Sequence, residues 1–157
     1  MKIVEKDPNS QDAFEMIEEL SETLMKITGN SGKGSFNTQD ISDVRAVFAV
    51  AYSDEGEPIG CGAIRPIDEH IAEVKRMYAK SKAKGVGTAI LAYLERQAKR
   101  LGYSKLCLET RLINKRAVAF YERRGYHRIA NYGKYAGREE AVCFEKEIKN
   151  VKDTRKL

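Results

Sequence analysis

Three apolar, strand-like runs joined by short turns constrain the fold of this chain more than any other feature. Residues 44–52 are almost wholly apolar, and runs at 59–65 and 71–78 follow after short turns that contain Asp and Glu with Gly or Pro. Short polar connections of this kind are typical of neighbouring antiparallel strands. The pattern predicts a three-stranded antiparallel meander at the centre of the fold.

Regular alternation along the third run separates its side chains into two faces, because successive strand residues point to opposite sides of a sheet. The two predicted sets are Glu73, Lys75 and Met77 on one face and Val74, Arg76 and Tyr78 on the other.

Helical periodicity surrounds the meander. Apolar residues recur at helical spacing over 14–27, opposite a row of glutamates, and Ser10 is placed to cap that helix. Glycines open and close a second helix over 85–102, and a third runs from Asn114 to Gly125. Further strands are expected at 2–5, 106–110, 126–129 and 139–148. The order predicts a mixed α/β (α+β) fold with one curved sheet.

Charge is divided unevenly along the chain, whose 157 residues suffice for about one domain. Residues 1–74 hold 15 acidic and 6 basic side chains, whereas residues 75–128 hold 15 basic and 3 acidic ones. A basic block of this kind suggests a polyanionic partner.

Several classes of protein are excluded early. No run approaches the ~18 apolar residues needed to span a bilayer, and the N-terminus lacks the apolar region of a signal peptide. The three cysteines, Cys61, Cys107 and Cys143, have no CxxC spacing, and the chain has two histidines. We therefore expect no metal site, buried reduced thiols, no membrane contact and a cytoplasmic location.

Two glycine clusters were compared with nucleotide-binding motifs. The cluster at 29–35 fails as a P-loop because Lys33 is followed by Gly34 rather than Ser or Thr, and because it follows a helix. The Gly-Val-Gly at 85–87 fails as a dinucleotide fingerprint, which needs a third glycine where Ile90 stands.

The segment 82–88, Lys-Ala-Lys-Gly-Val-Gly-Thr, lies between a strand and a helix. Unpaired N–H groups at a helix N-terminus bind anions, and glycines let a ligand approach the backbone. Lys80, Lys82 and Lys84 add positive charge. The alternative is a glycine-containing helix start with solvated lysines, and this segment alone leaves both interpretations open.

The strand at 73–79, the basic loop and Lys82-x-x-Gly85-x-Gly87 together resemble the acetyl-CoA signature of the GNAT superfamily of N-acyltransferases, Gln/Arg-x-x-Gly-x-Gly/Ala. Lys82 replaces the usual Gln or Arg and keeps a charged donor. A second family element follows at the expected place, formed by Asn114, Ala117, Phe120, Tyr121, Glu122, Gly125 and Tyr126.

This resemblance implies a curved, mostly antiparallel sheet of six to seven strands flanked by about four helices. It implies one domain over 1–148, followed by a polar tail over 149–157. It also implies acetyl-CoA as cosubstrate and direct transfer of an acetyl group, in a ternary complex, to a primary amine of a small molecule or peptide. A homodimer is plausible for the family.

The same resemblance assigns cofactor contacts residue by residue. The backbone of Met77, Tyr78 and Ala79 is expected to pair with the pantetheine arm. Asn114 is expected to contact the pantetheine or the pyrophosphate, although an N-cap role alone also accounts for it. The N–H groups expected to hold the pyrophosphate belong to the segment that contains Lys82, Lys84, Gly85, Val86, Gly87 and Thr88.

Two catalytic roles follow from the resemblance. Tyr121 matches the family's general acid, which protonates the departing thiolate, and the alternative is an aromatic residue packed beside Phe120. Glu73 matches a position that often holds the general base, and the alternative is a carboxylate paired with Lys75. Cys61 offers a ping-pong nucleophile, but its place in a strand between two glycines favours a packed thiol.

Two other functions compete with the enzyme. One is a non-catalytic CoA-binding regulatory module of the same fold. The other is a nucleic-acid binder that uses the basic block, which lacks an RNP-like or helix-turn-helix signature. We therefore expect no nucleic-acid partner. The acidic first part of the chain suggests a cationic acceptor amine.

Overall fold

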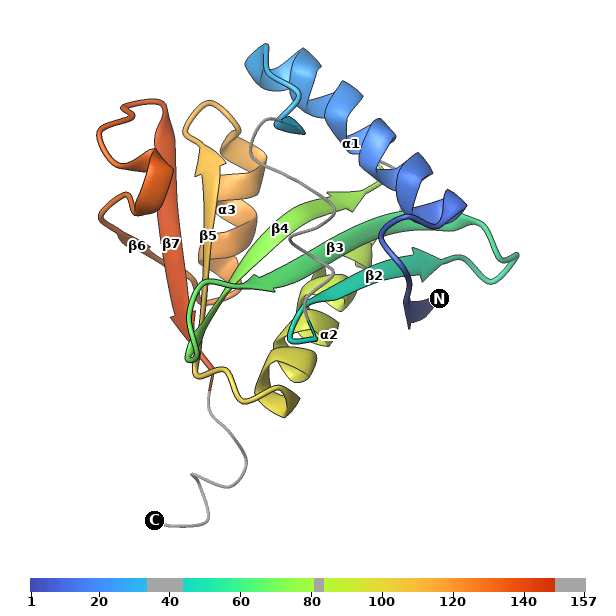
Figure 1. Ribbon diagram of the computed structural model, residues 1–157. Helices are drawn as coiled ribbons and strands as arrows, with labels where there is room; N and C mark the ends of the chain where they lie inside the picture. Colours follow the sequence, from blue (N-terminus) through green and yellow to red (C-terminus); the bar gives the residue numbers. More distant parts are fainter. Residues whose placement is uncertain (34–43, 81–83, 149–157) are drawn as a thin grey trace.

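The computed structural model describes residues 1–33, 44–80 and 84–148. Within them lies one seven-stranded sheet with the strand order β1-β2-β3-β4-β5-β7-β6 (Figure 1). Its strands are β1 (Lys2–Glu5), β2 (Val47–Tyr52), β3 (Pro58–Pro66), β4 (Ile71–Ala79), β5 (Lys105–Arg111), β6 (His127–Ile129) and β7 (Ala141–Glu147).

The meander is confirmed, because β2 pairs antiparallel with β3 and β3 with β4. Every other neighbouring pair is also antiparallel except β4 with β5, which is parallel. The sheet is therefore mostly antiparallel, and its one parallel pair lies near the middle.

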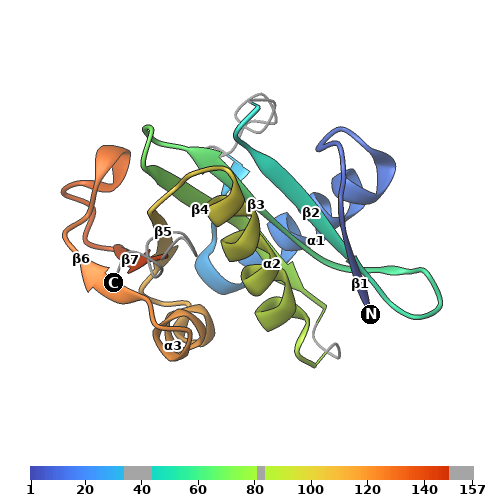
Figure 2. The same ribbon diagram turned by 90° about the horizontal axis from the view of Figure 1, so that it is seen from below.

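Helices cover both faces of the sheet (Figures 1 and 2). Helix α1 (Gln11–Thr28) lies on one face, whereas α2 (Val86–Arg100) and α3 (Lys115–Arg123) lie on the other. Strand β2 shows why both faces need a cover, since Phe48 and Val50 pack in the α1 cluster while Val47, Ala49 and Ala51 pack in the α2 cluster. A strand buried on both sides is a continuous apolar run.

Capping residues begin and end the helices where the sequence indicates. Ser10 Oγ accepts a hydrogen bond from the Ala13 N–H at 3.4 Å, and Asn114 Oδ1 accepts one from the Ala117 N–H at 3.3 Å. Gly29 ends α1 in the left-handed conformation, with φ 76°. These capping residues provide hydrogen bonds for backbone groups that a helix end leaves unpaired.

The expectation of about four helices is corrected. The described residues form three α-helices and one short 3₁₀ turn, Gly133–Tyr135. The fourth helix was implied by the family resemblance. Outside these helices, the described residues have no further apolar stripe at helical spacing that would bury a helix against the sheet.

The predicted face assignment along β4 is wrong after Lys75. Cys61 pairs with Tyr78 and Ala63 with Lys75, so two residues of β4 oppose Gly62 alone. One of them, Arg76, has a φ of 56°. Such a bulge bends a strand and shifts the later side chains by one position. Met77 consequently packs in the α2 cluster, whereas Tyr78 packs in the α1 cluster.

The parallel pair β4–β5 is short. Pairing covers only Ile71–Glu73 against Lys105–Cys107, although β5 stays paired with β7 along its whole length. Beyond Glu73 the two strands separate, and the bulge in β4 lies in the part that has left its neighbour. The sheet therefore opens between β4 and β5, and helices from both faces approach this opening.

Candidate functional site

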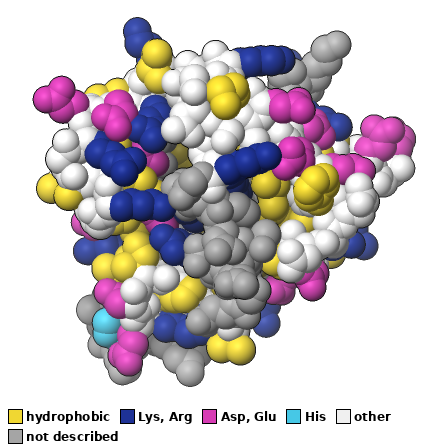
Figure 3. Space-filling model, turned by 45° about the horizontal axis from the view of Figure 1, so that its top comes forward, with side chains coloured by type: hydrophobic (Ala, Val, Ile, Leu, Met, Phe, Trp, Pro, Cys, Tyr) yellow, Lys and Arg dark blue, Asp and Glu magenta, His cyan; other side chains and the backbone are white. Residues whose placement is uncertain are grey.

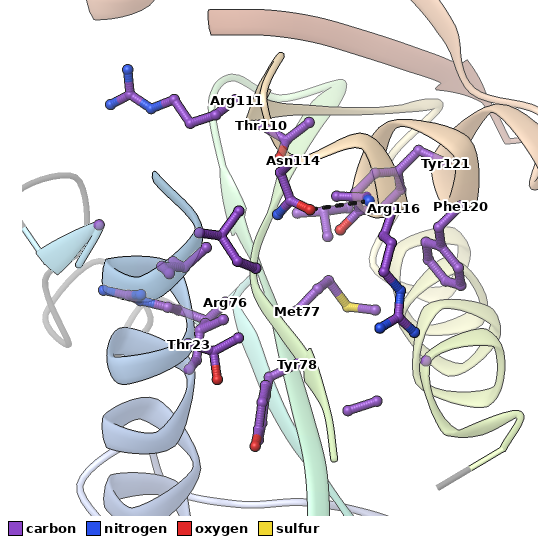
Figure 4. A pocket seen from close by; sticks show the side chains of 18 of the residues that line it. Thr23, Arg76, Met77, Tyr78, Thr110, Arg111, Asn114, Arg116, Phe120 and Tyr121 are labelled. Atoms are coloured by element: carbon purple, nitrogen blue, oxygen red, sulfur yellow. Dashed lines mark hydrogen bonds between the residues drawn. The ribbon is translucent and has the colours of Figure 1, made fainter. Parts of the chain in front are cut away.

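A pocket of about 670 Å³ lies at the opening between β4 and β5 (Figure 4). Its walls come from α1, from β4 after Glu73, from β5 near its end, and from the starts of α2 and α3. Because α1 covers the opposite face from α2 and α3, the pocket is lined by elements from both faces of the sheet.

Most of the predicted cofactor-binding residues line this pocket. Val86 does not, because its side chain is buried in the α2 core cluster. Lys82 lies outside the described residues. The predicted residues that line the pocket are Met77, Tyr78, Ala79, Lys84, Gly85, Gly87, Thr88, Asn114 and Tyr121.

The start of α2 has the geometry of an anion site. Gly85 has a φ of 76°, and a Cβ at that position would meet nothing within 4 Å. The first helical hydrogen bond there runs from the Ala89 N–H to the Gly85 carbonyl, so the N–H groups of residues 86–88 have no partner within the helix. Unpaired N–H groups beside open space fit a phosphate, as the acetyl-CoA signature implies.

Positive side chains surround this helix start. Lys84 and Arg116 line the pocket. Arg124 donates from Nη2 to Thr88 Oγ1 at 2.6 Å and from Nε to the same oxygen at 3.2 Å. Sequence reasoning did not find Arg124, because its partner lies 36 residues away and no local pattern links the two.

Asn114 combines the two roles considered for it from sequence. Its side chain caps α3 and also lines the pocket, where Figure 4 shows it near Thr110 and Tyr121. The N-cap is confirmed, and the ligand contact stays a prediction.

Tyr121 is packed and also faces the pocket. Its ring makes edge contacts with Phe120, at 5.2 Å between centroids, and with Tyr126, at 5.8 Å. In the described part of the chain, its hydroxyl has no hydrogen-bond partner, and the side chain lines the pocket. Burial raises the pKa of Tyr121 well above its ordinary value. The hydroxyl therefore keeps its proton at neutral pH.

Glu73 is fully buried and is not among the residues that line the pocket. Arg65 donates from Nε to Glu73 Oε1 at 2.8 Å, and the Tyr132 hydroxyl donates to Oε2. Lys75 Nζ lies farther away, 4.0 Å from Oε1. The geometry matches the paired carboxylate considered from sequence, with Arg65 rather than Lys75 as the nearest cation.

Glu109 is a carboxylate of the pocket that sequence reasoning missed. It lies on β5 and lines the pocket, and its Oε2 is buried without a hydrogen-bond partner among the described residues. Arg111 Nε is 3.7 Å from that oxygen. Burial raises the pKa of Glu109, and the negative charge of Glu73 acts in the same direction. The available sequence signal was a single acid near the end of an apolar strand.

Lys75 interacts electrostatically with both carboxylates. It donates from Nζ to the Tyr135 hydroxyl at 3.0 Å and lines the pocket. Its side chain is 10% exposed, and burial lowers its pKa. Lys75 therefore brings a partly desolvated positive charge to the wall of the pocket.

The cysteines are buried, as expected. Cys61 donates from Sγ to the Arg76 carbonyl at 3.2 Å, and burial raises its pKa to about 12. A thiol with so high a pKa is a poor nucleophile at neutral pH. In the ranges that the structure covers, no group of three His, Cys, Asp or Glu side chains is arranged to hold a metal ion, and no helix is long and apolar enough to cross a membrane.

Comparison with known proteins agrees with this arrangement. The Acetyltransferase (GNAT) family matches residues 14–126. An IAA acetyltransferase of Azospirillum brasilense is 28% identical over 149 residues, covering 93% of this chain and 97% of that protein.

Two solved structures have the same fold. An acetyltransferase from Streptococcus agalactiae superposes with a TM-score of 0.76 at 17% identity, covering 93% of this chain and 97% of that one. PaiA N-acetyltransferase from Thermoplasma acidophilum, solved in complex with coenzyme A, gives 0.69 at 19% identity, covering 94% and 99%. The family match spans more than two thirds of the chain and includes the opening between β4 and β5. The chain belongs to the GNAT family of acetyltransferases.

Proposed function

We propose that this protein transfers an acetyl group from acetyl-CoA directly to a primary amine of a small molecule or peptide. One observation carries the proposal: a single pocket brings together a helix N-terminus whose first N–H groups have no partner within the helix, a protonated tyrosine and a partly buried carboxylate with a raised pKa. These are Gly85 to Thr88, Tyr121 and Glu109. An acyl transfer to an amine needs an anion site for the donor, an acid and a base.

The donor half of the pocket fits a nucleotide thioester. The N–H groups at the start of α2 are available to phosphate oxygens, and Lys84 and Arg116 add positive charge at the same wall. Strand β4 is no longer paired with β5 at residues 77–79, so the β4 backbone on that edge can bond to the extended pantetheine arm. Acetyl-CoA supplies the activated acetyl group.

The proton of the acceptor ammonium needs a base, because only a neutral amine attacks a thioester. Glu109 is the stronger candidate by position, since it lines the pocket and burial raises its pKa. Glu73, the base implied by the family resemblance, is already bonded by Arg65 and Tyr132. In that position, Glu73 would take the ammonium proton by way of Lys75 or of a water molecule.

Tyr121 supplies the proton for the departing thiolate. Its side chain lines the pocket, and its hydroxyl stays protonated at neutral pH, as a general acid must before the reaction. Direct transfer is favoured over a covalent enzyme intermediate because all three cysteines are buried. The protein's own contribution is thus to hold two substrates together and to move two protons.

Initial rates of thiol release, measured with acetyl-CoA and a panel of amines, test the proposal. A ternary complex gives intersecting double-reciprocal lines, and parallel lines would indicate a covalent intermediate instead. Tyr121→Phe is expected to lower kcat about 10²-fold or more, in the range of general acid catalysis. Wild-type turnover in Tyr121→Phe at all pH values would remove the acid role.

The two bases are separated by their pH profiles. Glu109→Gln is expected to lower kcat/KM at least 10²-fold and to abolish the rise of rate with pH. Glu73→Gln is expected to keep that rise. The reverse result would assign the base to Glu73.

A CoA-binding module without turnover is the competing function. It predicts saturable binding of acetyl-CoA in calorimetry and no thiol release above the uncatalysed rate with any amine. The buried carboxylate in the pocket favours the enzyme, because binding a thioester does not require a base.

A further inference from the structure

The wall that α1 contributes to the pocket is largely apolar. Helix α1 contributes Leu20, Leu24 and Ile27 to this wall, together with the hydroxyls of Thr23 and Thr28. Figure 4 shows Thr23 and Arg76 on this side, across from α3. If acetyl-CoA binds with its phosphates at the start of α2, as proposed above, this opposite side is left for the acceptor, and we call it the acceptor half.

The acidic residues of α1 lie outside the pocket. Glu15, Glu18, Glu19 and Glu22 are not among its lining residues. Two of them are engaged by lysines, Glu18 by Lys33 at 3.0 Å and Glu19 by Lys80 at 3.9 Å. Figure 3 shows acidic side chains gathered toward the α1 side, apart from Lys and Arg side chains nearer the middle. The negative charge of α1 therefore does not form this wall.

Charges that do line the acceptor half are mostly positive. Lys75, Arg76 and Arg111 are present there, and Glu109 is the one carboxylate among the described lining residues. Lys75 lies 4.0 Å from Glu73, and Arg111 is bonded to Glu140 at 3.0 Å, but neither of these carboxylates lines the pocket. A polyamine or aminoglycoside would therefore bring several ammonium groups beside three lining cations and one lining carboxylate. Like charges at short range in a partly desolvated site repel strongly.

We propose that the acceptor is an amino acid with an apolar side chain, whose carboxylate meets the cationic wall. This assignment rests on the proposed acetyl transfer and names its substrate class. Glu109 Oε2 and Arg111 Nε are 3.7 Å apart on one strand face. A negative and a positive group this close match the adjacent ammonium and carboxylate of an amino acid. The side chain of the substrate packs on Leu20, Leu24 and Ile27.

Three amines test the assignment in the same thiol-release assay: L-leucine, L-leucinamide and spermidine. Leucine and leucinamide have the same side chain and the same α-amine. They differ in one group, which is a charged carboxylate in leucine and a neutral amide in leucinamide. Leucine is expected to have a kcat/KM at least tenfold above leucinamide, with spermidine below both. Equal values for leucine and leucinamide, or a preference for spermidine, would overturn the assignment.

Substitutions at two positions sharpen this comparison. Arg111→Gln is expected to bring the ratio of leucine to leucinamide close to one, whereas Arg111→Lys keeps part of it. Glu22→Gln changes an exposed acid of α1 outside the pocket and serves as the matched control. The control is expected to leave all three values within twofold. A selective loss of spermidine turnover in Glu22→Gln would support the cationic acceptor instead.

The test separates failure of the substrate class from failure of the proposed function. Acetylation of spermidine or leucinamide in preference to leucine overturns the class and leaves the acetyltransferase intact. Saturable acetyl-CoA binding with no acetylation of any of the three, or of the wider amine panel, overturns both.

Discussion

At the scale of single residues, Glu73 and Glu109 differ in surroundings although they lie on neighbouring strands. Glu73 is fully buried and receives hydrogen bonds from Arg65 and Tyr132. Glu109 lines the pocket and has one buried oxygen without a hydrogen bond in the described part of the protein. Buried carboxylates are stabilised by partners and destabilised without them. We therefore expect opposite effects on stability when each is replaced by glutamine.

Glu109→Gln is expected to stabilise the fold at neutral pH. Burial raises the folded-state pKa of Glu109 above the ordinary value of 4.5, so ionisation costs more in the folded than in the unfolded state. Stability of the wild type therefore falls as pH rises from the unfolded pKa through the folded one. Thermal unfolding should give Glu109→Gln a higher Tm at pH 8 and a smaller difference at pH 4. A variant less stable than wild type at pH 8 would contradict this cause.

Glu73→Gln is expected to destabilise the fold by about 3 kcal/mol, near the lower end of the cost of breaking a buried ion pair. The reason is that the partly buried Arg65, with 27% of its side chain exposed, loses its partner carboxylate. Urea unfolding measures the change, and Glu22→Gln on the exposed face of α1 is the control. A loss no larger than that of the control would mean that Glu73 contributes little to stability.

At the scale of elements, the start of α2 is set by one glycine. Gly85 takes the left-handed conformation in the turn before the helix, and open space lies where a Cβ would be. Gly62 on β3 has the opposite reason for being glycine, because a Cβ there would lie 2.5 Å from Met77 Sδ. One glycine thus leaves room for a ligand, and the other lets the bulged β4 pack beside α2.

Gly85→Ala is expected to raise the KM for acetyl-CoA and to destabilise the fold by about 1–2 kcal/mol, the cost of a left-handed alanine. Gly137→Ala is the matched control, since Gly137 has a φ of 80° and also has nothing within 4 Å of a Cβ. Gly137 does not line the pocket. Both variants should lose similar stability, and only Gly85→Ala should change KM. An equal rise of KM in both would mean that general destabilisation causes it.

At the scale of the whole molecule, the basic block of the sequence folds around the opening between β4 and β5. Strand β4 after Glu73, the start of α2, the end of β5 and α3 all come from residues 75–128, which carry the excess of positive charge. Such a field attracts a multiply charged anion and is screened by salt.

Added CoA is therefore expected to raise Tm, and the stabilisation reaches about 2.7 kcal/mol at a concentration 100-fold above Kd. The shift at a fixed CoA concentration should shrink between 50 mM and 500 mM NaCl, because the screening length falls about threefold over that range. Pantetheine, which lacks the phosphates, is the control and should show little salt dependence. A salt-independent CoA shift would argue against an electrostatic contribution from this block.

Much of the fold was predictable because its signals are local. The caps at Ser10 and Asn114 act within three residues along the chain, and β2 shows its burial in its own composition. The helix start that we propose as the phosphate site was also recognisable, since Gly85 and its neighbours are contiguous. Arg124 and Glu109 were not, because their roles depend on elements far apart in the sequence.

By itself, the sequence determined the meander, the three helices with their caps, and the strand-to-helix turn that marks the chain as a relative of acetyltransferases. Only the tertiary structure decided which carboxylate faces the pocket. The bulge at Arg76 changes the face of the later β4 side chains, and Glu73 is bonded by Tyr132 from 59 residues away. Local preferences specify an element, but contacts between distant segments decide which of its side chains are free to act.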